Sequence, residues 1–494
     1  MVSSPVFESL KDAVLRRRPV LKRIIETKGN EPLLDYALSY RSNKAKVDPV
    51  RKNELIEEIR SFTASLLGKE KGESVARQLS NYYYVSTTDH HGPISHPFFV
   101  SADILAALHR PELKDATHEN LIVLACSNVS LGNSSYPRSL LFHASGPEYE
   151  KIHFFSARDR VSPVFRLKSF GTEALDRARR DIESKYSRGA YSKKLKNKLE
   201  RVLGDIYDSP TVLELPNFAD QITVTNLNLW RRLFDVPISD LVYLELEKIV
   251  SNLIVQYHLS QETAIHRFIF DSGLYERMEK LFNGISGAFS KEKGTGTFLF
   301  WYFPEGARSR VSLVRKDTEL VSLDGQYKIP LKPEHIGMLL KKQELIPSTM
   351  LSLAILSCYY GLKCLGGFSQ VNYLTEIREA WDTLFDITGP KQDFEATLCG
   401  DFIIGLLEQG SDLLPATSLD FLLYGSHQSH SLFVESARNL TVTESLFLML
   451  PELYQILYPQ GEREPTLQAI DRNAIRGFLG LSGKIGPCLN VVNL

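Results

Sequence analysis

The residues best suited to chemistry in this chain gather in one short segment, SNYYYVSTTDHHGPISHPFFVSADIL, residues 80–105. Within eight positions, this segment holds four side chains that can bind a metal or transfer a proton: Asp89, His90, His91 and His96. The whole chain of 494 residues includes only 12 His. Imidazole nitrogens and carboxylate oxygens are ligands for Zn, Mn or Fe. Gly92-Pro93 allows a sharp turn between His91 and His96. We therefore expect Asp89, His91 and His96 to hold a divalent metal.

Two other interpretations of these residues need no metal. Histidine has an unperturbed pKa of ~6.5, so a small change of environment makes it a general acid or base at neutral pH. His96-Pro97 precedes a predicted helix, SADILAAL, whose N-cap we expect to be Ser101, and a histidine placed there can contact a phosphate. The third interpretation is structural, with polar side chains that satisfy backbone groups of the loop.

The segment VSTTDHH, residues 85–91, resembles the Asp-His-His element that ends a strand in the DHH phosphoesterase family. The resemblance covers about a dozen residues and implies a paired metal centre acting on phosphodiesters. That family also carries aspartates on upstream strands, whereas residues 1–80 are predicted to be helical here. We therefore do not extend the family's activity to this chain.

A second polar loop, CSNVSLGNSSYPRSLLF (residues 126–142), follows the next predicted strand. Its hydroxyls, amides and one guanidinium form a donor set that suits phosphate or carboxylate, and the predicted substrate-binding residues are Ser130, Asn133, Ser134, Ser135 and Arg138. Arg158, directly after the run KIHFF, is a further candidate for the same anion. The alternatives are a turn that satisfies its own backbone and an ion-pair network around Arg158.

Two glycine-rich stretches are weaker candidates. KEKGTGTFLFWYF places Gly294 and Gly296 ahead of a strand without the spacing of a P-loop, so we expect a turn that enters the strand, with phosphate contact as the alternative. LGGFSQVNYL places Gly366-Gly367 between two predicted helices, where glycine ends the first helix. Gln370, Asn372 and Tyr373, just beyond it, could line a pocket.

The elements around the histidines predict an α/β fold. The runs YYYVST, LIVLACS, RSLLFH and KIHFFS are short, rich in β-branched and aromatic residues, and separated by Gly, Pro, Asn and Ser. The first two flank the helix SADILAALH, so they predict a Rossmann-like parallel βαβ unit. The histidine loop then follows the C-terminal end of a parallel strand, which is where ligands bind in such sheets.

The chain is too long for a single core, since cores stop growing at ~250–300 residues. We divide it into an N-terminal helical region (1–80), an α/β core with the candidate active site (81–170), a charged helical insertion (171–290), a β-hairpin sheet (291–332) and a helical C-terminal region (333–494). Residues 221–282 are expected to be helices throughout. Asp324-Gly325 predicts a two-residue hairpin turn in the β-hairpin sheet.

Composition restricts the partners and the compartment. A net charge of −1 gives no overall field to attract nucleic acid, and the basic stretch 172–203 is expected to be a solvated helical pair broken at residues 187–189. The N-terminus lacks the apolar core of a signal peptide, and the five cysteines show no paired spacing, so a cytoplasmic protein with reduced thiols is expected. The uncharged run 345–362 contains Pro, Ser and Tyr and is expected to be a buried helix, with no membrane partner.

The sequence thus predicts an enzyme acting on a small anionic, possibly phosphorylated molecule. A metal-dependent hydrolase is favoured, because a bound metal would activate water. A metal-free, nucleotide-dependent transferase or ligase is the first alternative, and a non-catalytic binding or scaffold protein is the second. The sequence does not predict the oligomeric state.

Overall fold

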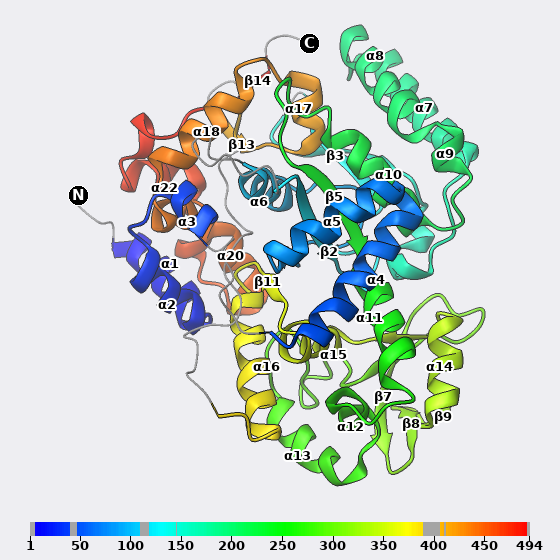
Figure 1. The fold of residues 1–494 in the computed structure, drawn as a ribbon. Coiled ribbons are helices and arrows are strands. Elements are labelled where there is room, and N and C mark those ends of the chain that lie inside the picture. Colours follow the sequence, from blue (N-terminus) through cyan, green and yellow to red (C-terminus); the bar gives the residue numbers. More distant parts are fainter. Residues whose placement is uncertain are drawn as a thin grey trace.

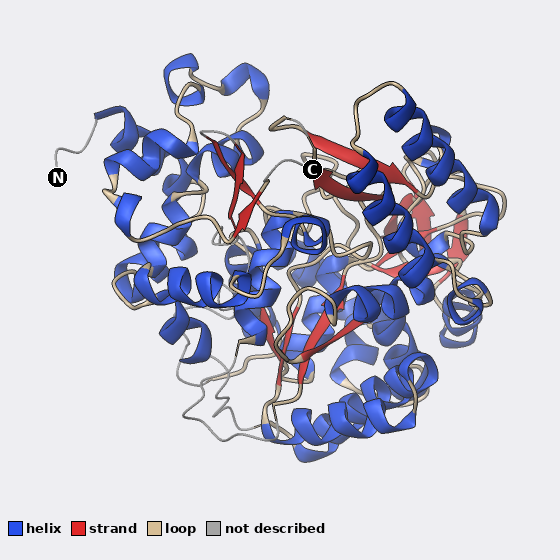
Figure 2. Ribbon diagram, turned by 90° about the horizontal axis from the view of Figure 1, so that it is seen from above, coloured by secondary structure: helices blue, strands red, loops and turns tan. Residues whose placement is uncertain are grey.

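The structure, a computed structural model, describes residues 5–39, 47–108, 118–144, 146–388, 406–409 and 412–491. It is a mixed α/β fold that contains a parallel sheet, so these two parts of the predicted fold class are confirmed. Helices make up most of the molecule, and the strands lie among them in several separate groups (Figure 2). The last helices of the chain, in orange and red, pack beside the first ones, in blue (Figure 1).

The N-terminal region is helical, as predicted, and contains α1 (Pro5–Arg16), α2 (Pro19–Lys28), α3 (Leu33–Ser39), α4 (Pro49–Leu67) and α5 (Lys69–Asn81). Asp48 caps α4 by accepting hydrogen bonds from the backbone N–H of Val50 and Arg51 at 2.9 and 3.2 Å. Pro49 is the first helical residue, where its fixed φ suits the helix and its missing N–H costs no hydrogen bond.

The central sheet has four parallel strands in the order β11-β1-β2-β5. The strands are β1 (Tyr84–Ser86), β2 (Asn120–Ala125), β5 (Asp240–Glu245) and β11 (Lys363–Leu365). Nearly all their side chains are buried, as expected for a parallel sheet covered on both faces. Helix α6 (Pro97–Ala107) connects β1 to β2, so the predicted parallel βαβ unit is present.

Two of these strands come from segments that we predicted to be helical. The prediction of helices throughout residues 221–282 is wrong at β5, which pairs with β2 along its whole length. The centre of the run DLVYLE, residues 241–244, is continuously apolar and contains a β-branched and an aromatic residue. Such a run is stable as a strand once both of its faces are covered. Strand β11 likewise interrupts the helical C-terminal region and pairs with β1.

The strands RSLLFH and KIHFFS are present but lie outside the parallel sheet. They form the antiparallel hairpin of β3 (Ser139–His143) and β4 (Tyr149–His153). The charged stretch forms the predicted helical pair, α7 (Thr172–Ser187) and α8 (Lys193–Val202), with the left-handed Gly189 between them. The following helices are α9 (Pro210–Leu213), α10 (Phe218–Trp230), α11 (Leu246–Leu253), α12 (Ala264–Phe270) and α13 (Ser272–Phe282).

The predicted antiparallel sheet is present, in the order β10-β6-β7-β8-β9. Its strands are β6 (Phe300–Tyr302), β7 (Val311–Lys316), β8 (Glu319–Ser322), β9 (Lys328–Pro330) and β10 (Leu345–Pro347). Asp324-Gly325 lies in the β8–β9 connection, but the two-residue turn predicted there is wrong. Val321 pairs with Lys328, and of the two turn residues only Gly325 has a positive φ, so the loop is longer.

The C-terminal region is mainly helical, with α14 (Pro333–Lys341), α15 (Thr349–Leu353), α16 (Gln370–Leu384), α17 (Ser418–Tyr424), α18 (Ser429–Asn439), α19 (Val442–Phe447), α20 (Leu450–Leu457), α21 (Pro465–Gln468) and α22 (Arg472–Phe478). A small sheet of β12 (Leu406–Gln409), β13 (Asp412–Pro415) and β14 (Leu489–Asn490) lies among them. The uncharged run forms β10, α15 and a buried π-helical segment, Ala354–Tyr359. Within the described ranges, no helix is both long and apolar enough to cross a bilayer.

No disulfide joins the four cysteines that the structure describes. The fifth cysteine, Cys399, lies outside the described residues. The domain boundaries proposed from the sequence stay predictions, although the central sheet draws strands from residues 84–125, 240–245 and 363–365.

Candidate functional site

The candidate site lies at the C-terminal edge of the parallel sheet. All four strands run in the same direction, so the loops that follow them meet at this edge. Along the chain, β1, β2 and β5 are added in one direction, and β11 is then added on the other side of β1. The loops after β1 and β11 therefore border the point at which the order of the strands reverses, where open α/β sheets have their binding crevice.

A cavity of about 390 Å³ occupies this position. The loop after β1 contributes His90 and His96 to its lining, and the loop after β2 contributes Ser134 and Ser135. Gly367 to Gln370, after β11, form another wall. The volume is within the range of pockets that enclose small molecules.

His90 is held in one orientation by the loop after β2. Its Nδ1 lies 3.0 Å from Asn133 Oδ1 and 2.9 Å from Ser135 Oγ. Asn133 Oδ1 also accepts hydrogen bonds from the backbone N–H and the hydroxyl of Ser135, at 3.0 and 2.9 Å. Because Asn133 Oδ1 is an acceptor, the His90 proton belongs on Nδ1, which leaves the lone pair on Nε2.

His96 has the opposite arrangement. It is the N-cap of α6, where its Nδ1 accepts a hydrogen bond from the backbone N–H of Phe98 at 3.4 Å. The proton of a neutral His96 is therefore on Nε2. The prediction that Ser101 caps this helix is wrong, because the helix begins at Pro97.

Burial keeps both imidazoles of the cavity neutral. It lowers the pKa of His96 to about 4, with a smaller contribution from His90. The pKa of His90 is also lowered by burial, partly offset by the hydrogen bond to Asn133. The ring of Phe99 lies against both, with centroid distances of 5.8 Å to His90 and 5.5 Å to His96.

Asp89 and His91 lie away from the cavity. The backbone hydrogen bonds from Cys126 N–H to Asp89 O and from His91 N–H to Cys126 O, both 2.8 Å, extend the pairing of β1 and β2 through His90. In an extended backbone, alternate side chains point to opposite sides, so Asp89 and His91 point away from His90. Both are fully buried.

The imidazole of His91 is buried without a hydrogen-bond partner among the described residues. The ring packs edge-on against Tyr243 at 5.2 Å. Burial lowers the pKa of His91 to about 3. Among all the residues that the structure describes, no three His, Cys, Asp or Glu side chains are grouped so that they could hold a metal ion. The metal centre of Asp89, His91 and His96 therefore stays a prediction from sequence.

The sequence did not identify Asp103 and Tyr243 as members of this buried cluster. Burial, the charge of Asp89 and hydrogen bonding to Asp89 raise the pKa of Asp103 well above its usual range, so Asp103 is protonated at neutral pH. The Tyr243 hydroxyl donates to the backbone oxygen of His90 at 2.9 Å. Asp103 is the one charged residue in the buried helix PFFVSADILAA, which was an available signal.

The predicted anion-binding residues divide into two groups. Ser134 and Ser135 line the cavity, and Asn133 orients His90. Ser130 pairs instead with Pro163 in an isolated bridge. Arg138 and Arg158 are not part of the cavity lining, and Arg158 is exposed on a short 3₁₀ turn.

The loop after β11 forms a wall of the cavity, although the sequence predicted a helix, and not a strand, before Gly366-Gly367. Gly366-Gly367 ends a strand and leads into α16, and Gln370 and Tyr373 line the cavity. Asn372 points elsewhere and accepts a hydrogen bond from the Val20 N–H at 2.9 Å. Ser369, at the N-terminus of α16, accepts a hydrogen bond from Arg18 at 3.1 Å, so this wall of the cavity carries positive potential.

Helix α20 contributes Glu452, Gln455 and Ile456 to the lining of the cavity. The Glu452 carboxylate forms an ion pair with Arg472, so its charge is already compensated. The cavity therefore combines two neutral imidazoles, several hydroxyls and a positive helix end.

Comparison with known proteins adds no assignment. No protein family model matches the chain, and no curated protein matches it. The function must therefore be inferred from the geometry of the site.

Proposed function

We propose that the chain is an enzyme that performs acid–base chemistry on a small anionic substrate in the cavity between β1 and β11. His90 is the general base and His96 is the hydrogen-bond donor. The observation that carries this proposal is the pair of contacts in one cavity, Asn133 Oδ1 at His90 Nδ1 and the Phe98 N–H at His96 Nδ1, from which opposite tautomers follow.

The step expected from this pair is a proton transfer. His90 Nε2 takes a proton from water or from a substrate hydroxyl, and the imidazolium that forms is stabilised by its hydrogen bond to Asn133 Oδ1. His96 Nε2–H donates to the oxygen atom on which negative charge develops. A neutral imidazole suits this second role, because burial keeps the pKa of His96 far below neutral pH.

The preference for an anion rests on the wall after β11. The N-terminus of α16 and the guanidinium of Arg18, bonded to Ser369, both favour negative charge at this side of the cavity. Burial lowers the pKa of Arg18, but a guanidinium stays protonated at neutral pH. A phosphate or carboxylate group of the substrate is expected against Ser369.

A Rossmann-like interpretation of the sheet is part of this proposal. It is supported by the β1–α6–β2 crossover and by the glycine turn that leads from β11 into α16. In such sheets, the crevice at the reversal of strand order binds the substrate or cofactor. If water is the group that His90 deprotonates, the reaction is a hydrolysis, and if it is a hydroxyl of a second substrate, the reaction is a transfer.

The proposal is tested by measuring conversion of a panel of phosphorylated and carboxylated metabolites by mass spectrometry. Wild-type protein should convert at least one of them, and His90→Gln should lower kcat by about 100-fold or more. His427→Gln, at an exposed position outside the cavity, is the matched control and should keep the wild-type rate. A folded His90→Gln with the wild-type rate would contradict the proposal, as would a panel in which nothing is converted.

A further inference from the structure

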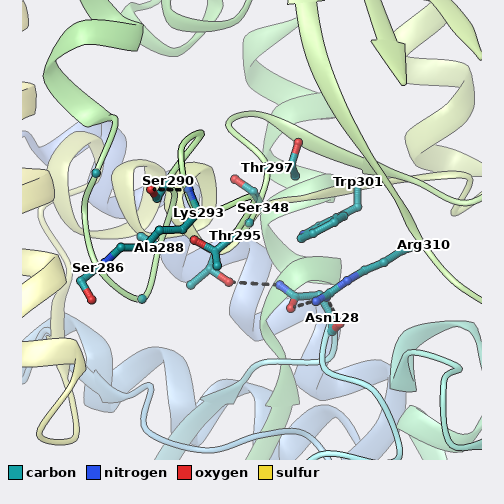
Figure 3. A pocket seen from close by; sticks show the side chains of 14 residues that line it. Asn128, Ser286, Ala288, Ser290, Lys293, Thr295, Thr297, Trp301, Arg310 and Ser348 are labelled. Atoms are coloured by element: carbon teal, nitrogen blue, oxygen red, sulfur yellow. Dashed lines mark hydrogen bonds between the residues drawn. The ribbon is translucent and has the colours of Figure 1, made fainter. Parts of the chain in front are cut away.

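A second cavity, of about 290 Å³, lies beyond the C-terminal end of β2 (Figure 3). Asn128, from the loop after β2, forms its floor, and the connection between α13 and β6 forms one wall. Trp301, Arg310 and Thr349 complete it. None of its lining residues belongs to the His90 cavity.

Arg310 is a fixed cation in this wall. Its guanidinium lies 4.0 Å from the centroid of the Trp301 ring and donates to both oxygens of Asn128, with 2.9 Å to Oδ1. Asn128 in turn donates to the buried Glu247 at 2.7 Å. The charge of Glu247 favours the protonated guanidinium of Arg310 from behind Asn128, although burial still lowers the pKa of Arg310.

Lys293 is the second cation and has no such compensation. It lines the cavity from the loop 284–297, its side chain is exposed, and it forms no ion pair with any residue that the structure describes. Lys293 thus adds a second positive charge to the cavity, beside the guanidinium of Arg310. Figure 3 shows Lys293 and Arg310 on different sides of the cavity.

Neutral donors lie between the two cations. Thr349 Oγ1 accepts a hydrogen bond from Asn128 at 3.3 Å, so its own hydrogen is available for a ligand. Ser286 and Thr295 present two more hydroxyls. By contrast, the hydroxyls of Thr297 and Ser348 already donate to backbone oxygens.

The loop that carries Lys293 needs glycine to keep this shape. Gly287 and Gly296 have φ values of +96° and +75°, which other residues rarely adopt. A Cβ at Gly296 would lie 2.3 Å from the backbone oxygen of Ala288. A Cβ at Gly287 would lie 2.9 Å from the ring of Tyr373, which also lines the His90 cavity, so the two cavities are neighbours across that ring.

We infer that this second cavity binds a small phosphorylated ligand, with the phosphate between Lys293 and Arg310. A phosphate has several acceptor oxygens and more than one negative charge, which matches two cations with hydroxyl donors between them. The volume is too small for a large cofactor and suits a phosphate with a small organic group or a diphosphate. The inference does not depend on the acid–base role of His90.

The test is isothermal titration of the full chain with inorganic phosphate and with pyrophosphate at constant ionic strength. Wild type should bind pyrophosphate at a saturable site that depends on Lys293, and Lys293→Glu should weaken that binding by about tenfold or more. Lys291→Glu makes the same change of charge two residues away, where the side chain pairs with Glu279 outside the cavity, and should stay within about twofold of wild type.

Lys293→Glu should convert the substrate panel within about twofold of the wild-type rate, because Lys293 is not part of the His90 cavity, and this separates the inference from the proposed catalysis. Absence of saturable binding to both anions would overturn the inference. Equal weakening by Lys291→Glu and Lys293→Glu would also overturn it, because binding would then follow the general surface charge. An unchanged affinity in Lys293→Glu would place the anion elsewhere.

Discussion

His91 should make the protein more sensitive to mild acid, and His91→Leu should remove the part of that sensitivity that comes from this imidazole. The imidazole is fully buried against Tyr243, and neither ring nitrogen has a hydrogen-bond partner among the described residues. Burial lowers its pKa to about 3, whereas an unfolded histidine titrates at ~6.5. Between these two values the unfolded chain binds the proton and the folded chain does not. The contribution to stability is therefore intact above ~6.5 and is lost as the pH falls toward the folded pKa.

The size of the effect follows from the two pKa values. At pH 5 the solution is ~1.5 units below the unfolded pKa, and each unit corresponds to ~1.4 kcal/mol, so His91 costs about 2 kcal/mol of unfolding free energy. Leucine has a similar volume and no nitrogen atoms to leave unsatisfied. At pH 7.5 we expect the unfolding free energy of His91→Leu to be within about 1.5 kcal/mol of wild type.

The assay is urea unfolding of both proteins at pH 7.5 and pH 5, followed by circular dichroism and tryptophan fluorescence. Wild type should lose about 2 kcal/mol more than His91→Leu between the two pH values. The reasoning is refuted if both proteins lose the same amount, because His91 would then not be a neutral, desolvated group in the folded chain.

Three further changes test other parts of the account. Asn133→Ala should lower kcat by about tenfold or more and leave the fold intact, because His90 would lose the acceptor that fixes its tautomer; unchanged kinetics would contradict this. Asp103→Asn should change the unfolding free energy by less than about 1 kcal/mol, since an amide can donate to Asp89 as the protonated carboxyl does, whereas Asp103→Ala should cost about 2 kcal/mol in the same urea assay. Elemental analysis of wild type and His91→Leu tests the metal centre predicted from the sequence: stoichiometric metal lost in the variant would support it, and no stoichiometric metal in either protein would contradict it.

The sequence located the histidine loop correctly, because its evidence is local. Strand β1, helix α6 and strand β2 each have a periodicity and boundary residues that can be recognised in a short window. The same window could not show how Asp89, His90 and His91 divide between the two sides of the chain. That division depends on the pairing of the His90 region with Cys126, which extends the strand beyond Ser86.

The other walls of the cavity depend on contacts between distant parts of the chain. Strand β11 is only Lys363–Leu365, too short to show any periodicity, and it is stabilised by pairing with Tyr84–Ser86. Its glycine turn was therefore interpreted as the end of a helix, although it leads into the helix whose N-terminus borders the cavity. Strand β5 was missed for a related reason, since an apolar run that is buried on both faces lacks the alternation that distinguishes a strand.

The central claim is that His90 and His96 are neutral and hold their protons on opposite ring nitrogens. The measurement that tests it most directly is the ¹⁵N chemical shift of the two imidazoles at pH 7, with histidine-labelled protein and with His90→Gln and His96→Gln to assign the signals. We expect the proton of His90 on Nδ1 and that of His96 on Nε2. A protonated ring at pH 7, or the same tautomer in both residues, would contradict the account.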